Sequence, residues 1–341
     1  MIGDSWIINH KKPSRGNPIS RIVESSVPSA THSRAVIGGT WALAIAALFL
    51  VPPRVLSDYQ LYTFNLALVN ILLAVGLNLV IGVARQFALF SGALFGIGAY
   101  VSGICQARYG IPFLAALPLA VAAAMLASAA TSLIAWRAGD LYLAMITFGF
   151  GEIFQFVLVH TDSLTNGPDG LAVPRPVVAG VSFATPSQLY TLFLPLTALA
   201  ILIYRSIETG QLGRLFVALG DSEAALASVG YDHRVIKTLS FAIQGAYAGL
   251  AGAFFAAAVG FIDPYSFGLA VTLQQLTAIA IGGFGSLAGA VVGSITLTVI
   301  DRVLVDFPGL RELGYGLCLL IVFLAFPGGL AGALLGRKSS P

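Results

Sequence analysis

Charged residues are scarce in this sequence. Asp, Glu, Lys and Arg account for 10% of its 341 residues, whereas 57% are hydrophobic. A soluble domain of this composition could not keep its apolar surface away from water, so the scarcity of charge excludes a soluble globular protein. The apolar residues form long runs separated by short polar connections, and this pattern predicts an all-α polytopic membrane protein.

Residues that supply common catalytic groups are also rare. The two cysteines, Cys105 and Cys318, lie in apolar runs, so neither a disulfide framework nor a cysteine-based metal site is predicted. None of the four histidines lies in an apolar run beside a candidate serine or second metal ligand, which argues against membrane proteolysis. None of the four lysines follows a glycine, so the GxxxxGK[ST] loop that binds ATP is absent from the sequence. We therefore expect no enzyme activity, no metal and no cofactor on this chain.

The apolar runs predict about ten membrane-crossing helices within 35–331. Eight are single runs, at 35–51, 61–82, 87–107, 113–136, 141–159, 189–204, 235–259 and 313–330. The stretch 269–300 is too long for one ordinary span, and IGGFGSLAG interrupts it at 281–289. We therefore expect two shorter helices that meet at this glycine-rich turn. If this pair is re-entrant, the number of true spans is eight.

The basic residues indicate orientation. They are dispersed along the ends of the apolar runs and form no patch, so the net charge of +3 does not indicate nucleic-acid binding. Residues 1–34 are expected to form a disordered cytoplasmic tail. A basic segment before an apolar run also suggests a signal peptide, but Pro52-Pro53-Arg54 offers no cleavage site, so we expect an uncleaved span. Thirteen of the eighteen Lys and Arg residues then lie in the cytoplasm, with the C-terminal tail 332–341 on the same side.

The segment 205–241 is the one sizeable internal stretch that combines several charges with a helical pattern. Its apolar residues recur at helical spacing and predict a short helix with one apolar face: Leu212, Leu215, Phe216 and Leu219. Gly220 should end this helix. We interpret 205–237 as a cytoplasmic loop that docks on another protein. The alternative is a solvated loop ordered only by local helix propensity.

A second, shorter helix should follow in this loop. Asp221 suits its N-cap, Glu223 lies in the first turn, where the helix dipole favours an acid, and Gly230 suits the position after its end. Alanines leave little bulk on this helix, so the groove of another protein can approach it closely.

Glu152 is the clearest ionisable residue inside an apolar run. A charged side chain at mid-membrane costs at least about 2.5–3.5 kcal/mol, so Glu152 needs a partner, a proton or water. Two interpretations stand side by side: a polar feature of a translocation path, and a hydrogen bond between helices. The neutral side chains of Asn65, Asn70, Asn78 and Gln155 also suit bonds between helices.

The connection 160–186 is longer than the others and contains DSLTNGPDGL, which predicts turns. The orientation given above makes it periplasmic, and we expect a docking or gating loop. Its key positions are Thr165, Asn166, Gly167, Asp169 and Gly170. The spacing of its aspartates fits no EF-hand, so calcium binding is not expected.

Six segments together resemble one known family. They are LNLVIGVARQFALFSGALFGIGAY, LYLAMITFGFGEI, SLTNGPDGL, GRLFVALGDSEAALASVG, VGFIDPYSFGL and IGGFGSLAGAVVG, in that order between Leu77 and Leu304. In content and order they are similar to the branched-chain amino-acid ABC importer permeases of the LivM type. Arg85 and Phe90 stand where that family more often has small or polar residues, which puts the transported solute in doubt more than the fold.

The resemblance implies a type II ABC importer permease fold in the bacterial inner membrane. It implies a second related permease subunit, two cytoplasmic subunits that bind ATP and Mg, a periplasmic solute-binding protein and an amino-acid-like solute as partners, with lipid around the spans. Transport would proceed by alternating access. The implied ATPase-coupling residues are Gly213, Arg214, Asp221, Ser222, Glu223, Ala224, Ala225, Gly230 and Lys237. The expected translocation-pathway residues are Asn78, Gln86, Ser91, Glu152, Gln155 and Gln274.

Two other functions remain compatible with the residues alone. One is an ion-coupled secondary transporter or channel that uses Glu152 as a proton or cation relay. The other is a membrane scaffold or receptor without transport.

Overall fold

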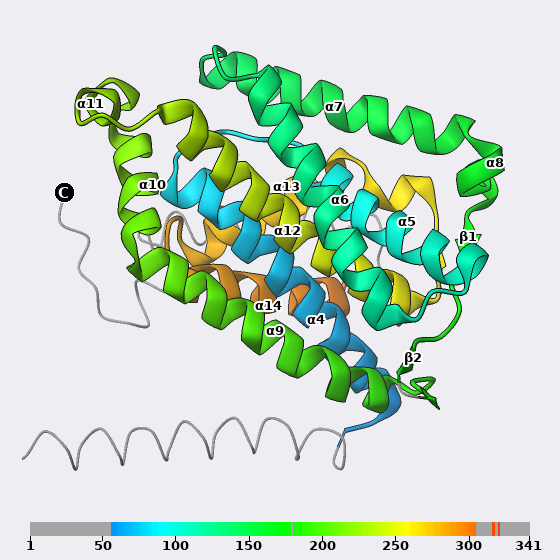
Figure 1. Ribbon diagram of the computed structural model, residues 1–341. Helices are drawn as coiled ribbons and strands as arrows, with labels where there is room; N and C mark the ends of the chain where they lie inside the picture. Colours follow the sequence, from blue (N-terminus) through cyan, green and yellow to red (C-terminus); the bar gives the residue numbers. More distant parts are fainter. Residues whose placement is uncertain (1–55, 179, 305–315, 318–319, 321–341) are drawn as a thin grey trace, which may run out of the picture. The chain divides into compact units, whose positions relative to one another are not determined.

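The computed structural model describes residues 56–178, 180–304, 316–317 and 320. The chain divides into two units, Met1–Arg54 and Val55–Pro341, and all described residues belong to the second. The expected span 35–51 and both terminal tails lie outside the described residues, as does nearly all of the expected span 313–330. The described part of the second unit is a bundle of helices (Figure 1).

Within the described residues, the regular secondary structure is helical apart from four very short strands. The helices are α4 (Asp58–Leu77), the π-helix η1 (Asn78–Val83), α5 (Ser91–Tyr109), α6 (Phe113–Ile134), α7 (Asp140–His160), α8 (Asp162–Thr165), the 3-10 helix η2 (Gly167–Asp169), α9 (Pro186–Thr209), α10 (Gln211–Asp221), α11 (Glu223–Ser228), α12 (His233–Val259), the 3-10 helix η3 (Pro264–Phe267), α13 (Leu269–Gly282) and α14 (Leu287–Val303). The strands β1 (Leu171–Ala172) and β4 (Phe261–Ile262) pair antiparallel, as do β2 (Val177–Val178) and β3 (Val181–Ser182).

Five of the described helical segments are long and apolar enough to cross a membrane, or six if the bent pair counts as one span. The five are Asp58–Val83, Phe113–Ile134, Leu141–His160, Pro186–Thr209 and His233–Val259, each close to an expected span. The run 87–107 differs from its prediction, because its helix α5 starts only at Ser91 and is not one of the five. Helix α5 contains four glycines, Gln106 and Arg108, and most of its residues are buried inside the bundle.

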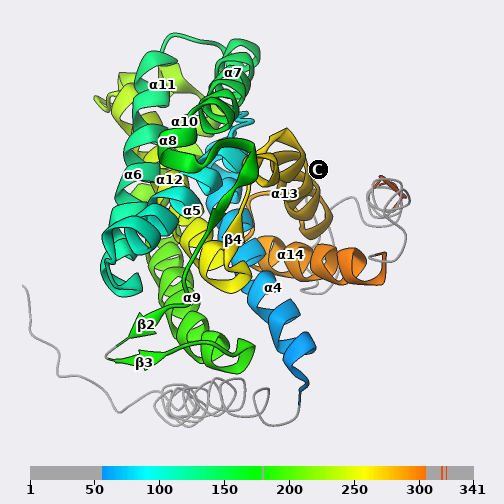
Figure 2. The ribbon, with the colours of Figure 1, turned by 90° about the vertical axis from the view of Figure 1, so that its right-hand side faces the viewer.

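The helices α13 and α14 form the expected broken pair. Their axes are bent by 119° at a break of a few residues (Figure 2). Within the turn, Gly283 has a φ of 109° and Gly285 a φ of 74°. Side chains with a Cβ rarely adopt such values, so these glycines permit the sharp turn.

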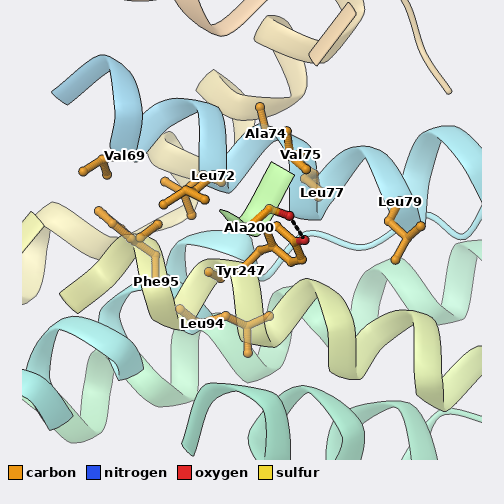
Figure 3. Packing of buried hydrophobic residues seen from close by; sticks show 14 of the residues in the cluster. Val69, Leu72, Ala74, Val75, Leu77, Leu79, Leu94, Phe95, Ala200 and Tyr247 are labelled. Carbon is orange, nitrogen blue, oxygen red and sulfur yellow. Dashed lines mark hydrogen bonds between the residues drawn. The ribbon is translucent and has the colours of Figure 1, made fainter. Parts of the chain in front are cut away.

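Helix α12 packs against α4, α5 and α6 through small residues. A Cβ added to Gly245 would lie 2.7 Å from Ser128 Cβ on α6, so the two backbones approach closely. Tyr247 supplies a larger contact on the same helix, because a Cβ added to Gly76 of α4 would lie 2.7 Å from Tyr247 Cβ. Its hydroxyl donates to the carbonyl of Ala200 on α9 at 2.6 Å (Figure 3). The core therefore combines close helix packing with a buried hydrogen bond.

The two unusual loops lie at opposite ends of this bundle. Helices α10 and α11 lie at one end, whereas α8 and β1 lie at the other (Figure 1). This separation is the one expected for loops on opposite sides of a membrane.

Candidate functional site

The loop between α9 and α12 contains the two predicted helices, but the boundary between them differs from the prediction. Helix α10 continues through Gly220 and ends at Asp221, so Gly220 does not stop it and Asp221 is not the next N-cap. Ser222 is the N-cap of α11, because its extended backbone lets its Oγ accept from the Ala225 amide at 3.2 Å. Gly230 lies just after α11 with a φ of 89°, as its predicted position requires.

Helix α11 exposes small side chains and is anchored by one large one. Leu226 is buried and packs against the hydrophobic core. The remaining surface, which we call the docking face, consists of the exposed residues Ala224, Ala225, Ala227 and Ser228. A face without bulky groups permits close approach of a second protein's backbone, which is the property that the sequence predicted.

Two ion pairs hold this loop to the rest of the bundle. Arg85 Nη1, in the connection after η1, lies 2.9 Å from Asp221 Oδ1. Lys237 Nζ, on α12, lies 3.6 Å from Glu223 Oε1. The Lys237 side chain is buried, so among the predicted coupling residues it supports the loop from inside and does not face a partner.

The two remaining coupling residues lie in the first part of α10. Gly213 is buried, and a Cβ there would overlap the carbonyl group of Glu208 at the end of α9. It therefore permits the tight connection from α9 to α10. Arg214 is exposed beside it and is free of the core packing that buries Phe216 and Leu219.

Glu152 lies on the outer face of the bundle, not in its interior. It is exposed on α7 and lines a groove of about 490 Å³ together with Gln155, His160 and Tyr265, while Ile153, Phe156 and Val159 complete the wall. On its other side Glu152 borders a hollow of about 10 Å³ formed with the start of α13. The carboxylate therefore lies in an open, largely apolar groove, which argues against a hydrogen bond inside the bundle.

Two pathway residues predicted from sequence, Glu152 and Gln155, come together in this groove. Gln155 also reaches the start of α13, since a Cβ on Gly268 would lie 3.2 Å from Gln155 Oε1. Sequence reasoning did not single out Tyr265, although it lies in the VGFIDPYSFGL segment that carries the resemblance. Its place in the groove depends on how the chain returns from α12 to α13.

The other four predicted pathway residues do not line the groove. Asn78 is fully buried in η1, and Ser91 is buried at the start of α5. Gln86 is buried beside η1 and donates to the carbonyl of Ala84 at 3.4 Å. Gln274 donates to Asp301 Oδ2 at 2.6 Å and so joins α13 to α14.

A polar cluster fastens the bent pair to α4. Gln275 Nε2 donates to Asn70 Oδ1 at 3.1 Å, and Asn70 Nδ2 donates to Thr298 Oγ1 at 3.1 Å. Asn65, five residues earlier on α4, donates to the carbonyl of Pro186 at 2.9 Å. The prediction that these asparagines bond across helices is confirmed.

The loop 160–186 contains the predicted turns. Asn166 has a φ of 67°, and its Nδ2 donates to the carbonyl of Gly170 at 3.0 Å. Thr165 is buried and its hydroxyl donates to the carbonyl of Leu158 at 2.7 Å. Gly167 is buried, and Asp169 is exposed. The turn is thus fixed onto the end of α7, beside the outer end of the groove.

Metal-binding groups do not gather in the part of the chain that the structure describes. Within those residues, no group of three or more His, Cys, Asp or Glu side chains is placed to hold a metal ion.

Comparisons with known proteins identify relatives over most of the chain. The family described as branched-chain amino acid transport system / permease component matches residues 59–326. The high-affinity branched-chain amino acid transport system permease protein LivM of Escherichia coli (strain K12) is 30% identical over 316 residues, which cover 84% of this chain and 73% of that protein. The autoinducer 2 import system permease protein LsrC of Salmonella paratyphi B is 29% identical over 282 residues, 78% of each chain. No solved structure matches this chain.

Proposed function

Because this chain belongs to the family of branched-chain amino acid transport system permease components, we propose that it imports branched-chain or related amino acids as one half of a permease pair. Members of this ABC importer family are multi-pass membrane subunits without catalytic activity of their own. The proposal adds a related second permease, two cytoplasmic ATP-binding subunits and a periplasmic solute-binding protein. The relatives include permeases named for branched-chain amino acids and for autoinducer 2. Family membership alone therefore does not identify the solute, and an amino acid as the solute is part of the proposal.

The docking face of α11 is the observation that carries this proposal. It combines small exposed side chains, an N-cap at Ser222 and an anchor at Leu226. We place it in the cytoplasm, seated in a groove of an ATP-binding subunit, because the loop 205–237 carries four of the chain's Lys and Arg residues and lies opposite the 160–186 loop. ATP-driven closure of the two ATP-binding subunits would displace α10 and α11 and switch the permease between its two access states.

The groove along α7 is the proposed wall of the solute path. A carboxylate in contact with lipid at mid-membrane costs at least about 2.5–3.5 kcal/mol, so the exposed Glu152 is better accommodated beside water or a protein. Gln155, His160 and Tyr265 add further polar groups to the same surface. The second permease subunit would close the groove into a path, and the periplasmic solute-binding protein would deliver solute at the end near the 160–186 loop.

The direct test uses the co-expressed complex of permeases and ATP-binding subunits, purified and placed in lipid nanodiscs. ATP hydrolysis is measured with and without the solute-loaded binding protein. We expect hydrolysis that requires the ATP-binding subunits and rises when the loaded binding protein is added. Solute uptake by this chain alone, driven by a proton gradient in liposomes, would contradict the proposal and support an ion-coupled carrier that uses Glu152.

A further inference from the structure

The π-helix η1 lies between the two parts of the molecule that a transport cycle must connect. Its wide turns continue past its end, since the Ala84 amide donates to the Leu79 carbonyl at 2.9 Å and the Gln86 amide to the Val80 carbonyl at 2.8 Å. Short π-helices of this kind are rare and occur frequently at functional sites. The contacts on the two sides of η1 indicate what this one does.

On one side, η1 touches the end of α10. A Cβ added to Gly220 would lie 3.0 Å from the Val83 carbonyl oxygen and 3.1 Å from that of Ala84, so backbone packs directly on backbone. One residue later, Asp221 pairs with Arg85 at 2.9 Å. Arg85 has a φ of 50°, a region that non-glycine residues seldom occupy, so this junction is conformationally strained. A displacement of α10 therefore acts directly on the end of η1.

On the other side, η1 touches the turn between α13 and α14. The Gly285 amide donates to Asn78 Oδ1 at 2.9 Å, and Asn78 Nδ2 donates to the Tyr204 hydroxyl at 3.4 Å. A Cβ on Gly82 would overlap both Asn78 Oδ1 and the Gly285 amide nitrogen. The turn is thus held against η1 by a buried side chain and by a contact that only glycines permit.

We propose that η1 is a mechanical relay that transmits a displacement of α10 and α11 to the turn between α13 and α14. The relay rests on the proposed function, because a bound ATPase must move the loop. Coupling between distant sites is carried by packed elements that have two discrete arrangements. In the relay, the contacts that would transmit the movement are the backbone contacts at Gly220 and Gly82 and the hydrogen bond between Asn78 and Gly285. The Arg85–Asp221 pair is solvent-exposed and adds only a small contribution.

The relay ends at the proposed solute path. Gly268, the N-cap of α13, and Leu269, its first residue, line the small hollow together with Glu152. A shift of the turn moves α13 and therefore changes the small hollow that borders Glu152. Asn78 is accordingly a positioning residue that acts through Gly285 and does not contact solute.

The test follows the exposed Phe284 in the turn. Phe284→Cys is introduced into the full chain with both native cysteines, Cys105 and Cys318, replaced by alanine, and the variant is assembled with its ATP-binding subunits in nanodiscs. The rate of maleimide labelling is measured with and without a non-hydrolysable ATP analogue. We expect the analogue to change this rate by about fivefold or more, the lower end of typical coupling between distant sites.

Asn78→Ala should abolish this ATP-dependent change, while the complex still assembles. Asn65→Ala is the matched control: it removes another fully buried asparagine of the same helical segment, bonded to Pro186, and should leave the change intact. Gly220→Ala provides an independent variant, because its methyl group crowds the end of η1 and should also reduce the change. Gly149→Ala is its control, since a Cβ there meets open space.

The outcomes separate the relay from the proposed function. Assembled complexes in which Phe284→Cys labelling does not respond to the analogue, or responds equally in Asn78→Ala and Gly220→Ala, would overturn the relay. If the ATP-binding subunits fail to co-purify with the unsubstituted chain, the proposed function fails, and the relay that rests on it fails with it. A response abolished by Asn78→Ala, reduced by Gly220→Ala and kept in both controls supports the relay.

Discussion

Lys237 of α12 holds its buried ammonium group 3.6 Å from the carboxylate of Glu223 at the start of α11. The Lys237 side chain is 2% exposed and the Glu223 side chain 43%. Among the described residues, Glu223 is the acidic partner on which the buried lysine depends, whereas water also solvates Glu223. The pair attaches α11 to the bundle from the inside and leaves the docking face outward.

This asymmetry predicts different effects for the two partners. Glu223→Gln leaves the buried ammonium without its counter-charge and should lower the free energy of unfolding by about 1–2 kcal/mol, less than the about 3–5 kcal/mol typical of a fully buried pair. Lys237→Met removes the buried charge at similar volume and should be nearly neutral. Thermal unfolding of the detergent-purified chain measures both; an equal loss in the two variants would refute the asymmetry.

The cap of α11 is a second test. Ser222→Ala removes the hydroxyl that accepts from the Ala225 amide and should destabilise the six-residue helix by about 1 kcal/mol. Amide hydrogen exchange across 223–228 should therefore accelerate by about fivefold. Ser228→Ala is the control, because its hydroxyl only donates to the Ala225 carbonyl within the same helix. Equal acceleration in both variants would show that Ser222 is not the cap.

The docking face predicts a steric effect on coupling. Ala225→Trp adds bulk to an exposed position, so the chain should still fold, but ATP hydrolysis by the assembled complex should fall about tenfold, which corresponds to about 1.4 kcal/mol. Ala107→Trp is the matched control, since Ala107 is also exposed and lies near the C-terminal end of α5, outside the docking face and the 160–186 loop. Full activity of the Ala225→Trp complex would contradict docking at this face.

Substitution of Glu152 tests whether the groove forms a wall of the solute path, as we propose, or faces lipid. If Glu152 faces the solute path, Glu152→Leu should reduce solute uptake about tenfold or more and change stability little. If Glu152 faces lipid, the same substitution removes a charge from the membrane and should stabilise the chain by about 2–3 kcal/mol with normal uptake. Ile153→Leu, at the neighbouring residue in the groove, controls for local packing. Uptake by the proteoliposome complex and thermal unfolding distinguish the two cases.

The sequence predicted the bundle well because the membrane imposes strong local constraints. The helical runs, the broken pair at 281–289 and the turns around Asn166 each depend on residues close together in the chain. The boundary between α10 and α11 was predicted wrongly. Asp221 is a good N-cap residue by type, but it ends α10 and its carboxylate forms an ion pair. Its partner Arg85 lies far away in sequence, and no local pattern reports that contact.

The candidate site was predicted only in part for the same reason. Glu152 and Gln155 lie near each other on α7, so helical spacing brings them together in the groove. Asn78, Gln86, Ser91 and Gln274 are equally polar, but tertiary packing turns them inward or toward other helices. Polarity inside an apolar run identifies an important residue without revealing which face of the bundle it occupies.

The central claim is that the docking face of α11 contacts an ATP-binding subunit in the cytoplasm. Ser228→Cys, in a chain whose native cysteines are replaced by alanine, places a photo-cross-linker on that face without removing the Ser222 cap. The account predicts a cross-link to the ATP-binding subunit and labelling by an impermeant maleimide only from the cytoplasmic side of the membrane. Labelling only from the periplasmic side, without a cross-link, would contradict it.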